Sequence, residues 1–395
     1  MALEWLRLND FRGFERLDLR FEPDLTVLVG VNGCGKTSVI DALLVGLELM
    51  PWKYSDVKLG ARQAEILIGL EGIPPIHRVV RTGKTRGLAR KRPRGPSLRE
   101  LVFTYSVDRP VRDATPGSTQ PGEWNQDDAR HDPRGPEGYD RFFHWFREME
   151  DEENERFRYG ESTESPSLDA VRSAVRALLP GYDHLRVIRR GAMGLAIPRL
   201  TVEKNGDVLL FDSLSEGERT IIAMIADIAR RLVIAHPESP RPLAEPFVLI
   251  IDEFEQHLHP QWQRELPARL RKVFPGAQLV LTTHSPIVVS ELLPRQLRPL
   301  QGFALLEGTH REGQDVNEIL ETLFDTPSRN RETQALIDAT DDALDDDDIE
   351  RAAESLETLE QALGSNDPEV VRLRTLQRIA SGQDHDAVAP LAPGP

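Results

Sequence analysis

The stretch of sequence that decides the fold reads Gly30-Val31-Asn32-Gly33-Cys34-Gly35-Lys36-Thr37. It fits the pattern G-x-x-x-x-G-K-S/T, in which glycines let consecutive backbone N–H groups converge on a polyphosphate without Cβ clashes. An apolar run at residues 25–29 precedes this stretch, and apolar residues at helical spacing follow it from Lys36. The order strand, glycine loop, helix predicts a phosphate-binding loop, residues 30–37, at a helix N-terminus.

The chemistry of such a loop gives its residues distinct tasks. Lys36 is expected to reach the β- and γ-phosphates of ATP, and the Thr37 hydroxyl to bind Mg²⁺. A chance match in a glycine-rich loop is the alternative, and the strand before and the helix after the loop argue against it. The cofactors expected are therefore ATP and Mg²⁺. The residues expected to contact the nucleotide are Gly30, Asn32, Gly33, Cys34, Gly35, Lys36, Thr37 and Ser38.

A second apolar run, residues 247–251, leads directly into Asp252 and Glu253. A run that is apolar throughout is typical of a parallel strand buried on both faces. Ligands bind at the C-terminal ends of such strands in open α/β sheets. We expect Asp252 to hold Mg²⁺ through water and Glu253 to polarise the attacking water. An ordinary strand that ends in acids is the alternative.

Two further segments stand beside these signals. Ser215 and Glu218 have the spacing of a capping box, which would open an apolar helix. That structural interpretation does not exclude a functional one, because a capped helix N-terminus also attracts anions. His284 lies just after residues 278–282, which are predicted to form another buried strand, and a lone histidine at such a position is more often structural.

Taken together, these segments resemble those of the RecF/SMC-like, ABC-type ATPases, and within that group the AAA ATPase branch of bacterial antiphage defence. The motifs that carry the resemblance are Leu8–Phe14, Gly30–Thr37, Leu214–Arg219, Asp252–Pro260 and Thr282–Pro286. They cover residues 1–70 and about 181–310. The C-terminal stretch, residues 316–368, is similar to the ATPase subunits of Septu-type and retron-linked antiphage systems.

The resemblance implies a fold and a set of roles. The fold is α/β, an ABC-type P-loop NTPase head whose mixed sheet has helices on both sides. An inserted α/β-loop subdomain and a helical acidic C-terminal extension complete it. In such heads a signature segment, here Ser215, Gly217 and Glu218, faces the γ-phosphate held by the opposite subunit. The resemblance further implies that His284 contacts the γ-phosphate and that Arg12 helps to bind the nucleotide, so that Glu253, His284 and Lys36 form the catalytic set.

The function implied is that of a switch ATPase that dimerises through its ATP-bound heads, or forms a higher oligomer. It would regulate a separately encoded nuclease or toxin in antiphage defence. The alternative is a RecF-like DNA-repair ATPase, in which the basic segment from Arg78 to Arg112 contacts DNA phosphates. Solvated surface is the plainer interpretation both of that segment and of the acidic C-terminal region. A transporter subunit fits poorly, because the segments at Leu8–Phe14 and Thr282–Pro286 argue against it.

Composition limits the remaining classes. The chain has 49 Lys and Arg against 65 Asp and Glu, a net charge of −16, which argues against a surface that is basic all over. No apolar run is long enough to predict a transmembrane helix, and no signal-peptide pattern is seen at the N-terminus. The single cysteine, Cys34, allows no intramolecular disulfide. We therefore expect a cytoplasmic protein without membrane contact.

The sequence predicts a division of the chain into five parts. Residues 1–70 and 181–310 are the two parts of the ATPase head, and residues 71–180 are an insertion or lid subdomain that is loop-rich and partly basic. Residues 311–382 are an acidic helical extension, and residues 383–395 a disordered tail. No glutamine closes the strand expected at 101–105, so the Q-loop residue stays unassigned. No heptad region predicts a coiled-coil arm, and no room for a Toprim nuclease is seen after Pro286.

Overall fold

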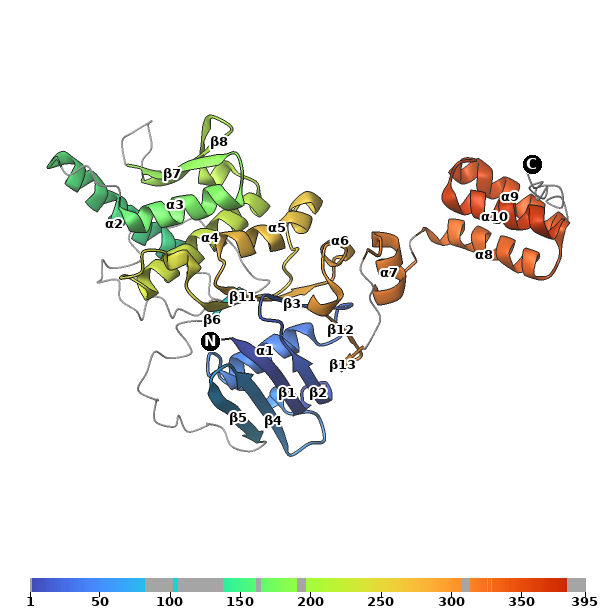
Figure 1. The fold of residues 1–395 in the computed structure, drawn as a ribbon, viewed down its shortest axis with the longest axis horizontal. Helices are drawn as coiled ribbons and strands as arrows, with labels where there is room; N and C mark the ends of the chain where they lie inside the picture. The colour runs from blue at the N-terminus through green and yellow to red at the C-terminus, as the bar shows by residue number, and fades with distance from the viewer. Residues whose placement is uncertain are drawn as a thin grey trace, which may run out of the picture. The chain divides into compact units, whose positions relative to one another are not determined.

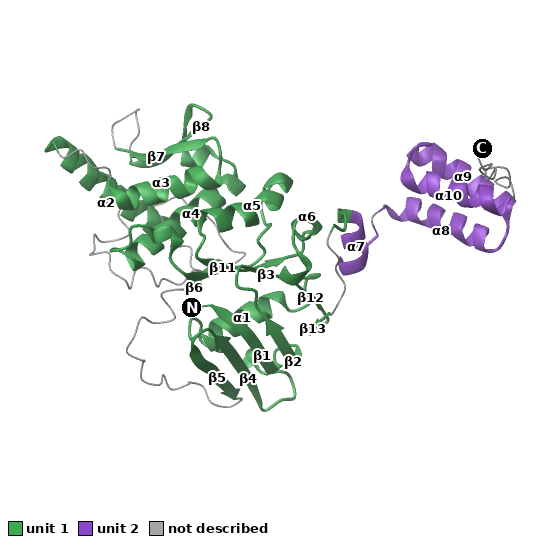
Figure 2. Cartoon of the chain, viewed as in Figure 1, with its two compact units in different colours: residues 1–316 green, residues 317–395 purple. Residues whose placement is uncertain are grey.

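The computed structural model describes most of the 395-residue chain: residues 2–81, 102–105, 138–160, 165–189, 197–306, 313–324, 326–327 and 329–381. The chain divides into two compact units, residues 1–316 and 317–395 (Figure 2). The tail predicted at 383–395 and the basic residues between positions 84 and 112 lie outside the described residues. The division into five parts therefore stays a prediction.

A six-stranded sheet forms the centre of unit 1, with the strand order β13-β12-β3-β11-β10-β6. Neighbouring strands run parallel, except that β12 and β13 are antiparallel. Strands β3, β10 and β11 are buried along their whole length, which explains why their sequences are largely apolar; the polar residues are Thr26, Gln278, Thr282 and Thr283. The strands are β3 (Leu25–Val29), β6 (Val102–Tyr105), β10 (Phe247–Ile251), β11 (Ala277–Thr283), β12 (Leu297–Gln301) and β13 (Ala304–Leu305).

An antiparallel sheet with the order β2-β1-β4-β5 lies beyond helix α1 (Lys36–Gly46). Figure 1 shows α1 between this sheet and the six-stranded one. Apolar side chains of α1 share one buried core with those of β1, β2 and β4 and with Val248, Ile250 and Val280 of the central sheet. The start of α1 is thereby held between two sheets. The antiparallel strands are β1 (Leu3–Phe11), β2 (Phe14–Arg20), β4 (Gln63–Leu70) and β5 (Ile73–Arg81).

Helices cover the other face of the six-stranded sheet, and a small sheet lies on the far side of these helices (Figure 1). The helices are α2 (Gly138–Arg158), α3 (Pro166–Leu178), α4 (Glu216–Ala235) and α5 (Pro260–Val273). The small sheet has the order β7-β8-β9, formed by Tyr182–Ile188, Arg199–Lys204 and Asp207–Leu210. Short helices complete the unit: α6 (Pro286–Val289) and the 3-10 turns Tyr54–Asp56, Phe211–Ser213, Pro242–Ala244 and Pro294–Gln296. The predicted α/β head with helices on both sides of its sheet is confirmed.

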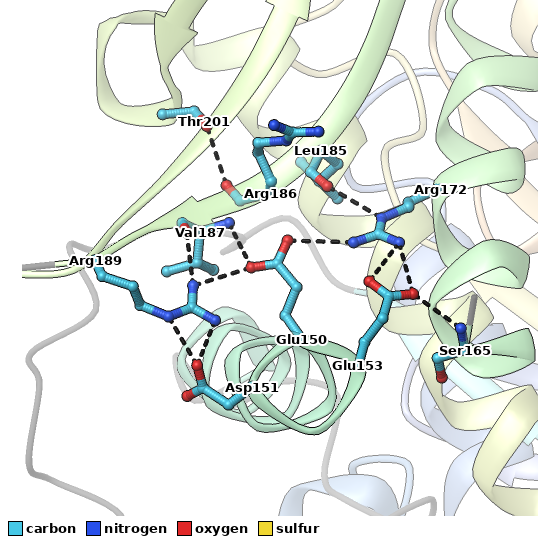
Figure 3. A network of polar contacts seen from close by, with 10 residues as sticks. All are labelled: Glu150, Asp151, Glu153, Ser165, Arg172, Leu185, Arg186, Val187, Arg189 and Thr201. Carbon is cyan, nitrogen blue, oxygen red and sulfur yellow. Dashed lines mark hydrogen bonds and ion pairs between the residues drawn. The ribbon is translucent and has the colours of Figure 1, made fainter. Parts of the chain in front are cut away.

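Two arginines and their acidic partners join α2, α3 and β7 (Figure 3). The buried carboxylate of Glu150 accepts from the backbone N of Val187 at 3.0 Å, from Arg172 Nη2 at 3.2 Å and from Arg189 Nη1 at 3.0 Å. Arg172 also binds Glu153 at 3.0 Å. A buried carboxylate is stable only when donors satisfy it in this way, so the network holds these three elements together.

Unit 2 contains helices α8 (Arg331–Asp345), α9 (Ile349–Leu363) and α10 (Pro368–Ala380), and most of α7 (Val316–Phe324). The small core of α8, α9 and α10 is formed by Ile337, Leu356, Leu359, Val370 and Leu373. Side chains of Asn330, Asp348 and Asp367 cap the three helices. The helical, acidic character predicted for this region is present. Within the described part of the chain, no helix is both long and apolar enough to cross a membrane.

Candidate functional site

Three adjacent strands bring the predicted catalytic residues to one edge of the central sheet. Strands β3, β11 and β10 are neighbours and run parallel, so their C-terminal ends meet. At that edge β3 leads into the phosphate loop, β11 leads into His284, and β10 leads into Asp252 and Glu253. Ligands bind at this edge in open α/β sheets. Residues more than two hundred positions apart in the sequence therefore converge on one place.

Packing as well as phosphate binding requires two glycines of the loop. Gly30 and Gly35 have φ values of 152° and 109°, in the region that favours glycine. A Cβ atom on Gly30 would lie 2.3 Å from the carbonyl oxygen of Leu300, and one on Gly35 would lie 2.7 Å from Cζ of Phe14. The sequence motif explains these glycines by the approach of phosphate. In the structure, β12 also packs closely against Gly30, and β2 packs closely against Gly35.

Lys36 is folded back onto its own loop. Its side chain is buried, and Nζ donates to the carbonyl oxygens of Gly30 at 2.6 Å and Val31 at 3.1 Å. A phosphate is a stronger acceptor for an ammonium group than a neutral carbonyl. The contacts therefore hold the Lys36 ammonium beside the place where phosphates would bind, and nucleotide would compete for it.

The other residues of the loop differ in what they offer a nucleotide. Asn32, Gly33 and Thr37 are exposed, so the Thr37 hydroxyl is accessible to a cation. Cys34 is 3% exposed, so its side chain is not accessible to a nucleotide, and its backbone N donates to the carbonyl oxygen of Val31 at 3.3 Å. Ser38 is half-buried on the first turn of α1. The roles predicted for these residues stay predictions.

Thr282 fixes the two carboxylates that follow β10. Its hydroxyl donates to Asp252 Oδ1 at 2.6 Å and accepts from the backbone N of Glu253 at 2.8 Å. Glu253 has a φ of 45°, a left-handed conformation that is uncommon for residues with a side chain. Sequence reasoning gave Thr282 no role, although it lies in the motif that contains His284.

A magnesium ion at this site would need few protein ligands. Among the described residues no group of three or more His, Cys, Asp or Glu side chains could hold a metal ion. Mg²⁺ bound with a nucleotide takes most of its oxygens from phosphates and water, with one or two from the protein. The exposed Thr37 hydroxyl and the Asp252 carboxylate are hard oxygen donors of this kind, so the residues present fit the ion.

His284 has a buried acidic partner that sequence reasoning missed. Its Nδ1 lies 2.9 Å from Oε1 of Glu255, which also accepts from the backbone N of His284 at 2.5 Å. The imidazole is 45% exposed, whereas the Glu255 side chain is 6% exposed. The signal in the sequence is Glu255 itself, a second acid two positions after Glu253 within the motif Asp252–Pro260, to which no role is assigned from the sequence.

The predicted capping box at the start of α4 is present. Ser215 Oγ accepts from the backbone N of Glu218 at 3.4 Å, and Glu218 Oε2 accepts from the backbone N of Ser215 at 2.8 Å. The Ser215 hydroxyl also donates to Glu218 Oε2 at 2.8 Å. A Cβ atom on Gly217 would lie 2.3 Å from the carbonyl oxygen of His257. Glycine is therefore required where this helix start packs on the segment after β10.

Glu218 is held by groups of its own chain. Tyr182 and Lys204 both donate to its Oε1. Burial alone would raise the pKa of Glu218, but hydrogen bonds from Lys204, Tyr182 and Ser215 outweigh it and lower the pKa to about 2. Burial and the nearby carboxylate raise the pKa of Tyr182 to about 12. Glu218 is thus a fixed anion that ties α4 to β7 and β8.

Replacing this anion has a predictable effect on stability. Glu218→Gln is expected to lower the free energy of unfolding at pH 7 by about 2 kcal/mol, the worth of hydrogen bonds to a charged group. Because the folded protein lowers the pKa of Glu218 from 4.5 to about 2, the stabilisation is complete above about pH 4.5 and is lost as the pH falls towards 2. Urea unfolding of both proteins across this range measures the difference.

The matched control for this substitution is Glu216→Gln, on the same helical turn. The side chain of Glu216 is 64% exposed, and its contact with His257 Nδ1 is long, at 3.8 Å. Replacing Glu216 should therefore leave the free energy of unfolding near that of the parent protein. If the difference in unfolding free energy between Glu218→Gln and the parent stayed constant from pH 7 to pH 3, the assigned role of Glu218 would be contradicted.

Arg12 lies in the turn between β1 and β2 and forms hydrogen bonds with two carboxylates. Its Nη1 donates to Asp41 Oδ2 at 2.6 Å, and its Nε donates to Asp56 Oδ1 at 2.9 Å. Burial alone would lower the pKa of Arg12, but the two acids raise it. Asp41 is on α1, so Arg12 braces the helix that begins with the phosphate loop. Its predicted contact with nucleotide stays a prediction.

Comparison with known proteins now places the chain. Residues 6–106 match the family described as "AAA domain", and residues 105–290 match "AAA domain, putative AbiEii toxin, Type IV TA system". The chain is similar to the "Retron Ec83 probable ATPase" of Escherichia coli, with 26% identity over an alignment of 471 residues that covers 93% of this chain and 85% of that protein. The chain thus resembles AAA ATPases along residues 6–290.

Two shorter matches relate the chain to further proteins. It is 34% identical over 101 residues to the Septu protein PtuA of Bacillus mycoides, covering 26% of this chain and 13% of the relative. It is 40% identical over 81 residues to the DNA replication and repair protein RecF of Roseiflexus castenholzii, covering 20% of each chain. The resemblance to ATPases of antiphage systems is confirmed, and so is the similarity to RecF.

Proposed function

We propose that this chain hydrolyses ATP in a site that two copies complete together. The observation that carries the proposal is the convergence of Lys36, Asp252, Glu253 and His284 at the C-terminal edge of three parallel strands. In the ABC-type heads that the chain resembles, the signature segment serves the opposite subunit. Here that segment begins with a capped helix N-terminus, which offers partial positive charge to a phosphate.

The residues of the site divide the work of hydrolysis. Backbone N–H groups of the phosphate loop and the Lys36 ammonium bind the β- and γ-phosphates. Thr37 and Asp252 hold Mg²⁺, which when bound neutralises charge on the phosphate oxygens. Glu253 orients a water molecule for attack on the γ-phosphate, and His284 contacts that phosphate. Little covalent chemistry is required of the protein, because positioning and charge neutralisation lower the barrier.

A site completed across an interface turns ATP into a switch. ATP contacts more protein in the dimer than in a single head, so it shifts the association equilibrium towards the dimer. Hydrolysis removes the γ-phosphate that both heads contact, and the dimer then loses that stabilisation. The cycle thus converts nucleotide state into a change of assembly.

The assembly is proposed to regulate a separately encoded effector, a nuclease or toxin, in antiphage defence within the cytoplasm. The similarity to the retron Ec83 and Septu PtuA proteins supports this role. The helices of unit 2, with exposed acids on α8 and α9, offer a surface for a partner protein. The motif set alone would fit many ATPases, so the relatives favour this assignment.

The alternative is a RecF-like ATPase that binds DNA, favoured by the match to RecF and by the basic segment. The two described basic side chains of that segment are engaged: Arg78 pairs with Glu48, and Arg81 Nε donates to Gln63 Oε1 at 3.3 Å. The other basic residues lie outside the described part of the chain.

ATPase rates with and without duplex DNA separate the two functions. For the effector-regulating switch we expect Mg²⁺-dependent hydrolysis that DNA does not stimulate, and copurification with the product of a neighbouring effector gene expressed beside it. DNA stimulation that weakens steeply with salt would instead support the RecF-like function. That stimulation should then disappear when four basic residues are neutralised together: Arg90, Lys91, Arg92 and Arg94.

A further inference from the structure

We propose that Glu255 is a positioning residue, which orients the ring of His284 so that Nε2 faces the γ-phosphate. The proposal rests on the proposed ATP site and adds to it a group that no sequence motif assigned. The Glu255 side chain is buried, so we expect it to act through His284 and not by contacting the nucleotide itself.

The contact between the two residues involves both the backbone and the ring. Glu255 Oε1 accepts from the backbone N of His284 at 2.5 Å and lies 2.9 Å from its Nδ1. A carboxylate can only accept hydrogen bonds, so Nδ1 carries a proton in this contact. With the backbone and one ring nitrogen fixed to the same oxygen, the imidazole loses its freedom to rotate or flip.

The exposed side of the ring follows from this contact. Nε2 is the second ring nitrogen, separated from Nδ1 by Cε1, and the His284 side chain is 45% exposed whereas that of Glu255 is 6% exposed. The nitrogen bound to Glu255 therefore faces the interior, and Nε2 is presented outward at the edge where β3, β11 and β10 end. A carboxylate that holds one nitrogen and leaves the other for substrate is a recurring way to orient a functional histidine.

The charge of the pair fits a phosphate. With Nδ1–H bound to Glu255, a neutral ring offers a lone pair at Nε2, whereas a ring protonated at both nitrogens donates from both. A phosphate oxygen accepts hydrogen bonds, so a hydrogen bond from Nε2 to the γ-phosphate needs a proton on Nε2 as well as on Nδ1. Glu255 thus occupies Nδ1 and leaves Nε2 for the phosphate.

The backbone around Glu255 is fixed on both sides. The backbone N of Phe254 donates to the carbonyl oxygen of Thr282 at 3.0 Å, and the carbonyl oxygen of His257 packs against Gly217 at the start of α4. Glu255 Oε2 is buried without a hydrogen-bond partner. Burying such a carboxylate costs free energy. Among the described residues, the contacts that offset this cost are the two that Oε1 makes with His284.

The experiment combines nuclear magnetic resonance with kinetics in the full chain. Protein labelled with ¹⁵N in its histidines is recorded at about pH 9, above the pKa of a free imidazole. The His284 signals are identified by their loss in His284→Ala. We expect the parent protein to show the Nδ1–H form, Glu255→Ala to shift His284 towards the Nε2–H form, and Glu255→Gln to keep the parent form because its amide oxygen still accepts.

The kinetic arm uses the same variants. Glu255→Ala should reduce kcat by about 10- to 100-fold, by analogy with the loss on removing the carboxylate partner of a metal-binding histidine, with little change in KM for ATP. Glu255→Gln should retain more activity than Glu255→Ala. The double variant with His284→Ala should be no slower than His284→Ala alone, because the two residues act as one unit. Glu291→Ala, an exposed acid paired with Arg264, is the matched control and should behave as the parent.

Two results would overturn the proposal. One is a His284 tautomer that does not change in Glu255→Ala, and the other is a double variant whose losses add. A parent protein that does not hydrolyse ATP would count against the proposed function only, because the nuclear magnetic resonance measurement needs no turnover. The two failures are therefore distinguishable.

Discussion

Glu253→Gln is expected to reduce ATP hydrolysis by about 10²- to 10⁴-fold, the usual contribution of a positioned proton acceptor, while ATP still binds. The amide has the shape of the carboxylate, and the backbone N of Glu253 keeps its bond to Thr282 Oγ1 at 2.8 Å. The left-handed backbone at a φ of 45° is therefore undisturbed. Phosphate release measures the rate, and equilibrium binding of a fluorescent ATP analogue measures affinity.

Glu291→Gln serves as the control, since its side chain is exposed and pairs with Arg264 at 3.5 Å. It should hydrolyse ATP at the parent rate. If Glu253→Gln turned over as fast as this control, the water-orienting group would have to be another residue. If it lost ATP binding together with turnover, Glu253 would instead be holding the site together.

Lys36→Ala is expected to weaken ATP binding by about 100-fold or more, because charge-assisted hydrogen bonds to phosphate are each worth roughly 1.5–3 kcal/mol. In the structure the ammonium contacts only the carbonyl oxygens of Gly30 and Val31 among its described partners, so the fold should survive its loss. ATP should raise the melting temperature of the parent protein and not that of the variant. Lys58→Ala, on the surface 3.5 Å from Glu15, is the control and should respond as the parent does.

Mixing two inactive variants extends this prediction to the composite site. Lys36→Ala removes the phosphate contact of Lys36 but leaves Ser215 intact. Ser215→Arg blocks the signature segment but leaves Lys36 intact. If each chain completes the other's site, a mixed pair contains one intact site, and the mixture should hydrolyse ATP although neither variant does alone. A mixture as inactive as its components would argue that each head works by itself.

Much of the fold was readable from the sequence because local signals carried it. The glycines before Lys36 predicted the loop, the apolar runs before Asp252 and His284 predicted buried parallel strands, and the Ser215 capping box predicted the start of α4. Each of these signals lies within a few residues of the feature it predicts. Such local consistency is typical of sequences that fold to one structure.

The parts that escaped prediction depend on contacts between distant segments. Glu255 meets His284 across 29 positions, and Thr282 reaches Asp252 across 30. Tyr182 reaches Glu218 across 36 positions. Periodicity and motif spacing carry no information on such pairs, since only the order of strands in the sheet decides which loops become neighbours.

The molar mass of the Glu253→Gln protein in solution, with and without ATP and Mg²⁺, tests most directly whether nucleotide joins two heads. One chain has a mass of 44.5 kDa, and light scattering readily distinguishes it from a pair. We predict that ATP doubles the mass, and that adding Ser215→Arg to the same chain abolishes the doubling. A mass that stays unchanged at saturating ATP would contradict the account.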